Sequence, residues 1–170
     1  MIEYSVANVK VSLKTSKIFL DNVCEIAKEK KLYCKNYKNF IVIKSTFTYI
    51  IFKSKDEQSE SHVNITKIPN TNNILEAILT IQSLIPCTII SYKIDNIIAT
   101  TSLKKKINLE TISKSGKFKN LKYNNEKFPG LFIRFSLGTV IIFHSGKIVI
   151  VGCKSEDSIK CLIQKISALI

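Results

Sequence analysis

The chain contains an internal repeat, and this repeat limits its possible folds more than any other feature. Residues 128–145, FPGLFIRFSLGTVIIFHS, align without gaps with residues 37–54, YKNFIVIKSTFTYIIFKS, at an offset of 91. Asn8 and Asn96 match at an offset of 88, within β-rich segments. Because a repeat of this length sets the architecture before local propensities are considered, residues 1–170 are predicted to form one domain. Its two repeats are expected to cover residues 1–86 and 87–170.

Composition is typical of a soluble protein of one domain. The chain has 170 residues, of which 45% are hydrophobic, enough for a sizeable core. No apolar run approaches the roughly eighteen residues of a membrane span, and the first ten residues lack a signal-peptide pattern. The five cysteines are an odd number without CxxC spacing. They are therefore expected to be free thiols in a reducing compartment, with neither a disulfide framework nor a zinc site.

The net charge of +13 favours a polyanionic partner. Residues 1–90 hold 12 lysines and 8 acids, while residues 91–170 hold 13 lysines, one arginine and 5 acids, so the halves carry +4 and +9. An AT-rich genome would also enrich Lys, Ile and Asn, whatever the function. Charge alone leaves both explanations open.

Each repeat is predicted to run strand, helix, four strands, helix. In the second repeat, Gly138 and Gly146 mark hairpin turns, and Ser155 is the expected N-cap of the last helix. Strands are expected at residues 91–100, 117–123, 131–136, 139–143 and 147–152. The last helix should bury one stripe, formed by Ile159, Leu162, Ile163, Ile166 and Ile170; the matching stripe of the first repeat is Ile74, Leu75, Ile78, Ile81 and Ile85.

The strands at residues 139–143 and 147–152 are apolar on both faces. One face carries Val140, Ile142, Ile148 and Ile150, and the other carries Ile141, Phe143, Val149 and Val151. Two helices per repeat cover only one face. The other face therefore either binds a ligand or is buried by a barrel, a sandwich or a dimer.

Residues 126–135, EKFPGLFIRF, followed by VIIFHSGKIVIVGCKSEDSI, resemble the C-terminal repeat of the TATA-box-binding protein family, which reads ELFPGLIYRM and then LLIFVSGKVVLTGAK. The resemblance implies an α+β saddle in which two pseudosymmetric repeats form a curved ten-stranded antiparallel sheet, with helices on the convex face. It also implies a general transcription factor that binds A·T-rich promoter DNA in the minor groove, bends it and nucleates assembly of the initiation complex.

Site residues follow from this resemblance. In the second repeat, Phe128 and Phe143 are the expected intercalating wedges. In the first repeat, Phe52 and Tyr37 take these places. The expected base and groove contacts are Asn8, Asn96, Ile98, Thr66, Val149 and Val151, and the expected phosphate contacts are Arg134 and Lys147.

The first repeat departs further from the family pattern than the second. Lys10 occupies a groove position that the family fills with valine, and residues 54–61, SKDEQSES, replace the SGK turn with acids. Binding is therefore expected to be asymmetric, tighter and more bent at the second-repeat end.

The implied partners are double-stranded A·T-rich DNA, transcription factor IIB-like and other initiation factors, and, indirectly, RNA polymerase. Tyr123 and Glu126 match the stirrup that recruits transcription factor IIB. The alternative is a diverged protein-interaction module with weak or no DNA bending. The two histidines share no metal-ligand spacing and no phosphate cradle or catalytic set is present, so neither an enzyme nor a cofactor is expected. The expected location is the nucleus, or the cytoplasmic transcription site of a large DNA virus.

Overall fold

The computed structural model describes residues 2–53 and 60–169. The strands are β1 (Tyr4–Thr15), β2 (Tyr33–Asn36), β3 (Phe40–Lys44), β4 (Thr48–Phe52), β5 (Ser61–Ile68), β6 (Ile89–Ser102), β7 (Leu121–Lys122), β8 (Gly130–Phe135), β9 (Gly138–Phe143) and β10 (Lys147–Cys153). The helices are α1 (Val23–Glu29), a 3-10 turn η1 (Thr71–Asn73), α2 (Ile74–Leu84), α3 (Leu109–Lys114) and α4 (Glu156–Leu169). Over this part of the chain the sheet has ten strands in the order β2-β3-β4-β5-β1-β6-β10-β9-β8-β7. The predicted fold class and the predicted element order of each repeat are confirmed.

The chain divides into two compact units that do not coincide with the two repeats. The first-repeat unit is Asn8–Asp95, and the second-repeat unit is Met1–Ala7 with Asn96–Ile170. Both first strands are thus divided: residues 4–7 of β1 belong to the second-repeat unit, and residues 89–95 of β6 belong to the first-repeat unit. The boundary between residues 86 and 87 stays a prediction about the repeats, since the compact units are divided elsewhere.

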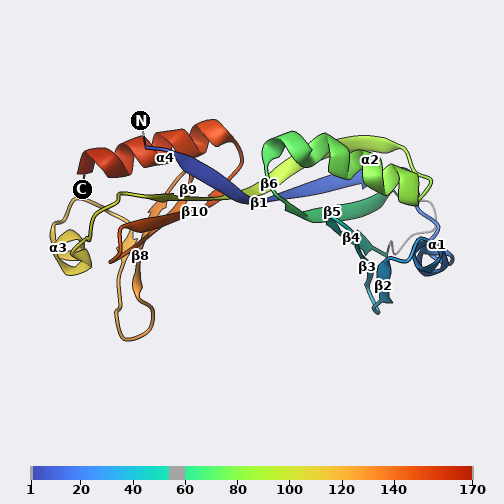
Figure 1. Cartoon of the computed structure of the whole chain (residues 1–170), viewed down its shortest axis with the longest axis horizontal. Helices are drawn as coiled ribbons and strands as arrows, with labels where there is room; N and C mark the ends of the chain where they lie inside the picture. The colour runs from blue at the N-terminus through green and yellow to red at the C-terminus, as the bar shows by residue number, and fades with distance from the viewer. Residues whose placement is uncertain (1, 54–59, 170) are drawn as a thin grey trace. The chain divides into compact units, whose positions relative to one another are not determined.

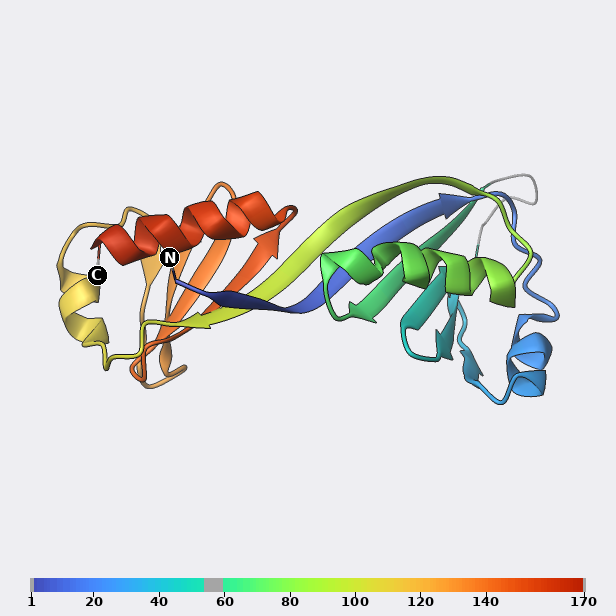
Figure 2. The same cartoon turned by 45° about the horizontal axis from the view of Figure 1, so that its top comes forward.

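The second-repeat unit packs its long helix against one face of its strands. Figure 2 shows α4 lying along these strands. Side chains of β9 and β10 alternate between buried and half-buried, which confirms the predicted assignment of residues to two faces. The helix begins after Ser155, whose Oγ accepts from Ser158 N at 3.2 Å. It buries Ile159, Leu162, Ile163 and Ile166, as its apolar spacing predicts; Ile170 lies outside the described residues.

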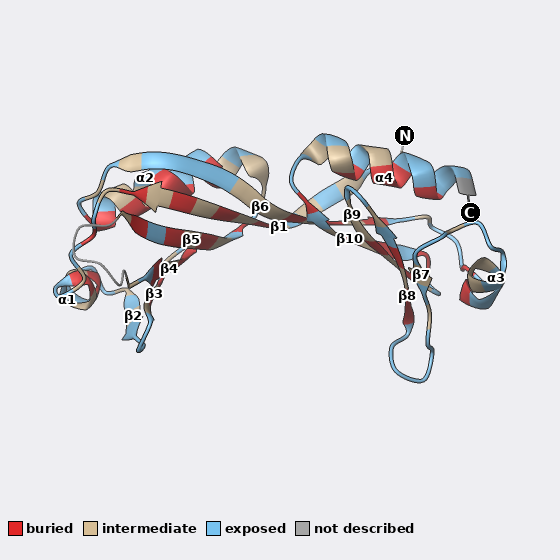
Figure 3. Cartoon of the chain, turned by 180° about the vertical axis from the view of Figure 1, so that it is seen from behind, coloured by how far each residue is buried: buried red, intermediate tan, exposed pale blue. Residues whose placement is uncertain are grey.

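The first-repeat unit repeats this arrangement with α2 (Figure 1). Asn70 opens η1 by accepting from Asn72 N through its side chain, at 2.9 Å. The buried residues of α2 turn toward the strands (Figure 3), where the Tyr49 hydroxyl donates to the Ala77 carbonyl at 3.0 Å. The stripe prediction was wrong for Leu75, which is exposed, because it lies on the side of α2 away from the strands.

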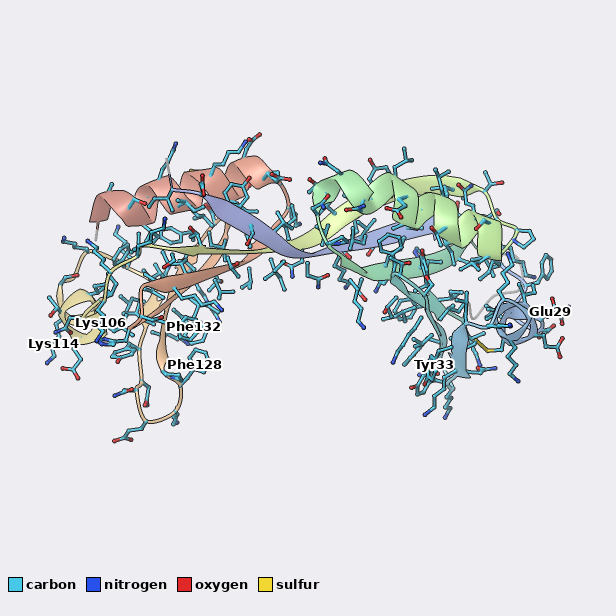
Figure 4. The ribbon with its side chains drawn as sticks, in the orientation of Figure 1. Glu29, Tyr33, Lys106, Lys114, Phe128 and Phe132 are labelled. Atoms are coloured by element: carbon cyan, nitrogen blue, oxygen red, sulfur yellow. A yellow bond between two sulfur atoms is a disulfide. The ribbon has the colours of Figure 1, made fainter. Side chains whose placement is uncertain are left out.

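Cys24 and Cys34 form a disulfide between α1 and β2 (Figure 4). The prediction that the cysteines are all free thiols was therefore wrong. The odd number of cysteines and the lack of CxxC spacing could not reveal this pair, because the two cysteines meet only through a turn of the chain. Lys31, with φ 56°, reverses the chain after α1 and brings the two Cα atoms to 5.4 Å. Among the described residues, no helix has both the length and the apolar character needed to cross a bilayer.

Candidate nucleic-acid interface

Each unit leaves one face of its strands uncovered by its long helix, and this face is called the open face below. In the second-repeat unit the open face is apolar at its centre. Its half-buried side chains come from β6, β8, β9 and β10: Ile98, Phe132, Ile141, Phe143, Val149 and Val151. The surface is a mainly apolar strip with two hydrogen-bonding residues on β6: Asn96, at the start of its β6 segment, and Thr100, opposite Val149.

Three phenylalanines form a cluster at the β8 end of this strip. The Phe128 ring centroid lies 5.1 Å from that of Phe132 and 5.9 Å from that of Phe143. Figure 4 shows Phe128 and Phe132 together beside β8, on the side away from α4. Phe128 keeps 39% of its surface exposed. A ring held on two sides and open on the third can insert between flat, apolar surfaces such as stacked bases.

Gly130 provides the space that Phe128 occupies. A Cβ atom at this position would lie 2.6 Å from Phe128 Cε1 and 2.9 Å from Ile141 Cγ2, closer than carbon atoms can approach. Asn124 forms the turn that leads to Phe128: its side-chain oxygen accepts from Glu126 N at 3.1 Å and from Lys127 N at 3.2 Å. The exposed ring of Phe128 therefore rests against Gly130, and the turn at Asn124 fixes the loop that carries it. Sequence reasoning singled out neither residue for this role.

Asn8 and Asn96 have equivalent positions in the two units. The Oδ1 atom of Asn8 accepts from Lys67 N at 3.0 Å, and that of Asn96 accepts from Gly152 N at 2.7 Å. Lys67 and Gly152 both have positive φ, 62° and 86°. Because a backbone N–H can only donate, the amide oxygen must face it and the NH₂ group must point elsewhere. Each asparagine therefore offers donors, which suits the acceptors that every A·T pair shows in the minor groove.

The ring cluster of the first-repeat unit is built differently from the prediction. Strand pairing places Phe40 opposite Phe52, just as Gly130 lies opposite Phe143. The offset between β3 and β8 is therefore 90, one less than the ungapped alignment gave. Tyr37 stacks on Phe40 at 4.7 Å, and Phe40 lies 6.3 Å from Phe52.

Phe40 was missed because the extra residue of the second repeat lies in the turn between β8 and β9. Arg134 pairs with Thr139 there, whereas Lys44 pairs with Thr48 in the first repeat. Matching the two basic strand ends, Lys44 and Arg134, would have revealed the shift. The insertion of Tyr37 into DNA stays a prediction.

The open face of the first-repeat unit is polar near β1 and β6. Ser12 pairs with Asn64 and Lys14 pairs with His62, all on this face. The Ser12 hydroxyl also donates to Asp95 Oδ2. Lys10 Nζ lies 3.7 Å from Asp95 Oδ2, and Lys93 Nζ lies 3.7 Å from Oδ1. The predicted groove residue Thr66 lies farther along, opposite Thr48.

Basic side chains lie at the margins of both open faces. In the first-repeat unit, Lys35 and Lys44 place their ammonium groups over the rings of Tyr37 and Tyr33, at 5.0 and 4.7 Å. In the second-repeat unit, Arg134 on β8 and Lys147 at the start of β10 are exposed. Exposed cations beside an apolar floor suit phosphate contacts.

The two predicted partner residues lie beside Phe128. Tyr123 is half-buried, and Glu126 is exposed in the turn formed by Asn124. Tyr123 borders a hollow of about 460 Å³, which is lined by Asn108, Leu109, Glu110, Tyr123, Asn125, Pro129 and His144. The acidic turn predicted to repel phosphate in the first repeat lies mostly outside the described residues, at positions 54–59. Within the described ranges, no cluster of three or more His, Cys, Asp or Glu could hold a metal ion.

Comparison with known proteins gives one consistent family. Residues 91–170 match the family described as transcription factor TFIID (or TATA-binding protein, TBP). TATA-box-binding proteins of Thermococcus kodakarensis and Pyrobaculum calidifontis are 39% and 33% identical over 79 and 82 residues. These alignments cover 45% and 47% of this chain and 40% of each relative. The chain thus spans about two fifths of the length of these curated relatives.

The solved structure of Methanococcus jannaschii TBP is similar to this chain, with a TM-score of 0.79 and 29% sequence identity. The match covers 98% of this chain and 97% of that one. It therefore includes the first repeat, which lies outside the residues 91–170 that match the family model.

Proposed function

Because this chain belongs to the TATA-box-binding protein family, we propose that it is a transcription factor that binds A·T-rich promoter DNA through its open faces. Binding takes place in the minor groove and requires no cofactor or catalysis. The apolar strip of the second-repeat unit packs on A·T edges, which lack the guanine amino group. Phe128 and Phe143 enter between base steps, and the bend offsets the cost of unstacking by burying more protein surface.

The observation that carries the proposal is the orientation of Asn96. Its oxygen is held by Gly152 N at 2.7 Å, so that its amino group is presented beside a mainly apolar strip. A donor within an apolar surface matches the A·T minor groove, where purine N3 and thymine O2 are acceptors and little else is polar. A core or dimer contact would leave this donor buried without a partner, at a cost of about 1–3 kcal/mol.

Recruitment of other initiation factors is the second part of the proposal. The loop that carries Glu126 offers an exposed acid, and Tyr123 and Asn125, which precede it, line a hollow. A transcription factor IIB-like protein would bind there, and RNA polymerase would follow through that protein. The family resemblance motivates this assignment.

Fluorescence anisotropy with A·T-rich and G·C-rich duplexes of equal length, at several salt concentrations, tests DNA binding. The protein should prefer the A·T-rich duplex. Removing both rings, by Phe128→Ala with Phe143→Ala, should weaken that binding by about a hundredfold or more, because each buried ring contributes about 1.5–3 kcal/mol and each 1.4 kcal/mol is tenfold. Phe19→Ala is the matched control, since Phe19 is 74% exposed and lies on none of the strands.

A second candidate function is a protein-interaction module that no longer bends DNA. The ion pairs of Asp95 with Lys10 and Lys93 favour it, because they make the first-repeat open face polar. Equal binding to both duplexes, or binding to neither, would support this candidate instead.

A further inference from the structure

The two open faces differ most at one place, where the first-repeat unit carries Asp95. At the repeat offset of 88, Asp95 corresponds to Ala7 of the second-repeat unit, and Lys10 corresponds to Ile98. Asn64 likewise corresponds to Val149 at an offset of 85. At this place the second-repeat face carries Ala7, Ile98 and Val149 beside the hydroxyls of Ser5 and Thr100, while the first-repeat face carries a carboxylate and an amide.

Asp95 has acceptor capacity that the protein itself does not use. An ionised carboxylate has about four lone-pair sites and no donor. Ser12 donates to Oδ2, but the nearest ammonium groups, those of Lys10 and Lys93, lie at 3.7 Å, beyond hydrogen-bonding distance. The Ser12 hydroxyl lies 2.9 Å from Asn64 Oδ1 as well, so one proton serves two acceptors. The side chain of Asp95 remains 22% exposed and can accept from a ligand.

The bases offer such a donor in only one case. In the minor groove an A·T pair shows only acceptors, whereas a G·C pair adds the 2-amino group of guanine. A carboxylate pressed against an A·T edge would face only other acceptors. It would lose its hydration without gaining a hydrogen bond, which is costly for a charged group. Against a G·C edge the same carboxylate accepts a hydrogen bond. Lys10 and Lys93 offset its repulsion of the nearby phosphates.

We propose that Asp95, oriented by Ser12, recognises a G·C pair through the guanine 2-amino group. The DNA site of this protein would then be A·T-rich under the second-repeat unit and contain a G·C pair under the first-repeat unit. This inference rests on the proposed function, since it assumes that the open faces contact the minor groove. It departs from uniform A·T preference because the first-repeat face is not apolar.

Base analogues test the inference, because they change only the amino group. In an otherwise A·T-rich duplex, one pair is varied at each position in turn among A·T, G·C, inosine·C and 2,6-diaminopurine·T. Inosine is guanine without the 2-amino group, and diaminopurine is adenine with it. At one position, G·C and diaminopurine·T should bind about fivefold to tenfold more tightly than inosine·C and A·T, as expected for one good base contact.

Asp95→Ala should abolish this difference and leave binding to the all-A·T duplex equal or tighter. The second-repeat unit carries alanine at the matching position, and a thermal melt checks that the variant is folded. The matched control is Asp157→Ala, which removes a carboxylate that is 91% exposed on α4 and should keep the amino-group preference.

Two different failures can be separated. Binding to the all-A·T duplex without an amino-group effect at any position would overturn this inference alone, and Asp95 would serve only to neutralise Lys10. Binding to none of the duplexes would overturn the proposed function and this inference with it.

Discussion

At the scale of single residues, the candidate site depends on side chains that hold others in place. Gly130 leaves room for a ring, Asn124 shapes the loop before it, and Gly152 turns the amide of Asn96 outward. None of these supporting residues needs to touch DNA. Their effects should therefore appear only through the residue that each of them supports.

Gly130→Ala provides such a case. The added methyl group would lie within 3 Å of Phe128 and Ile141, so the exposed ring must move, while the backbone accepts alanine because its φ is not positive. A two-dye bending assay should show a smaller bend with little change in melting temperature. In a Phe128→Ala background the same substitution should have no further effect on bending. Additive losses would show that Gly130 acts on something other than the ring.

At the scale of elements, a buried tyrosine joins β4 to α2 in the first-repeat unit. Tyr49 is fully buried and its hydroxyl donates to the Ala77 carbonyl. Burial raises the pKa of Tyr49 from 10.0 to about 12, because a phenolate would lose its hydration there. The neutral form is thus favoured in the folded protein, and the packing of strand on helix becomes sensitive to alkaline pH.

Because the folded pKa lies above the unfolded value, this stabilisation is complete below about pH 10 and is lost as pH rises toward 12. It amounts to about 3 kcal/mol, since one pKa unit corresponds to about 1.4 kcal/mol. Denaturant titrations from pH 8 to pH 12 should show that the free energy of unfolding falls less steeply in Tyr49→Phe than in the wild type. Burial and the nearby Glu156 also raise the pKa of Tyr4 to about 12. Tyr4 is present in both proteins, so its contribution cancels when the two slopes are compared. If the free energy of unfolding fell equally steeply with pH in both proteins, the raised pKa of Tyr49 would be contradicted.

At the scale of the whole molecule, the two units share one plan but have different surfaces. The second-repeat open face combines three clustered rings with an apolar strip, whereas the first-repeat face combines Tyr37, Phe40 and Phe52 with a polar floor. The two ends of a bound duplex should therefore be held unequally. The charge excess of the second half, +9 against +4, acts in the same direction.

Phe143→Ala should consequently reduce DNA bending more than Phe52→Ala. Phe143 contacts the exposed Phe128 directly, while the loss of Phe52 leaves Tyr37 and Phe40 stacked on each other. The two-dye assay compares the variants on one duplex at one salt concentration. Equal losses, or a larger loss for Phe52→Ala, would remove the asymmetry from the proposal.

The sequence predicted what repeats and periodicity can encode. The element order, the two faces of β9 and β10, the turns at Gly138 and Gly146 and the cap at Ser155 are all local patterns. Contacts between distant residues were not predictable from such patterns. Asp95 meets Ser12 across 83 residues, Cys34 meets Cys24 only through the reversal at Lys31, and Phe40 replaces Gly130 only because one turn is a residue longer.

The division of β1 and β6 between the units has a consequence for any attempt to separate the two repeats. Each repeat lends the start of its opening strand to the other repeat, so neither can complete its own layer of strands alone. Cleavage of the chain between residues 86 and 87 would therefore take residues 89–95 from the first-repeat unit and residues 1–7 from the second-repeat unit.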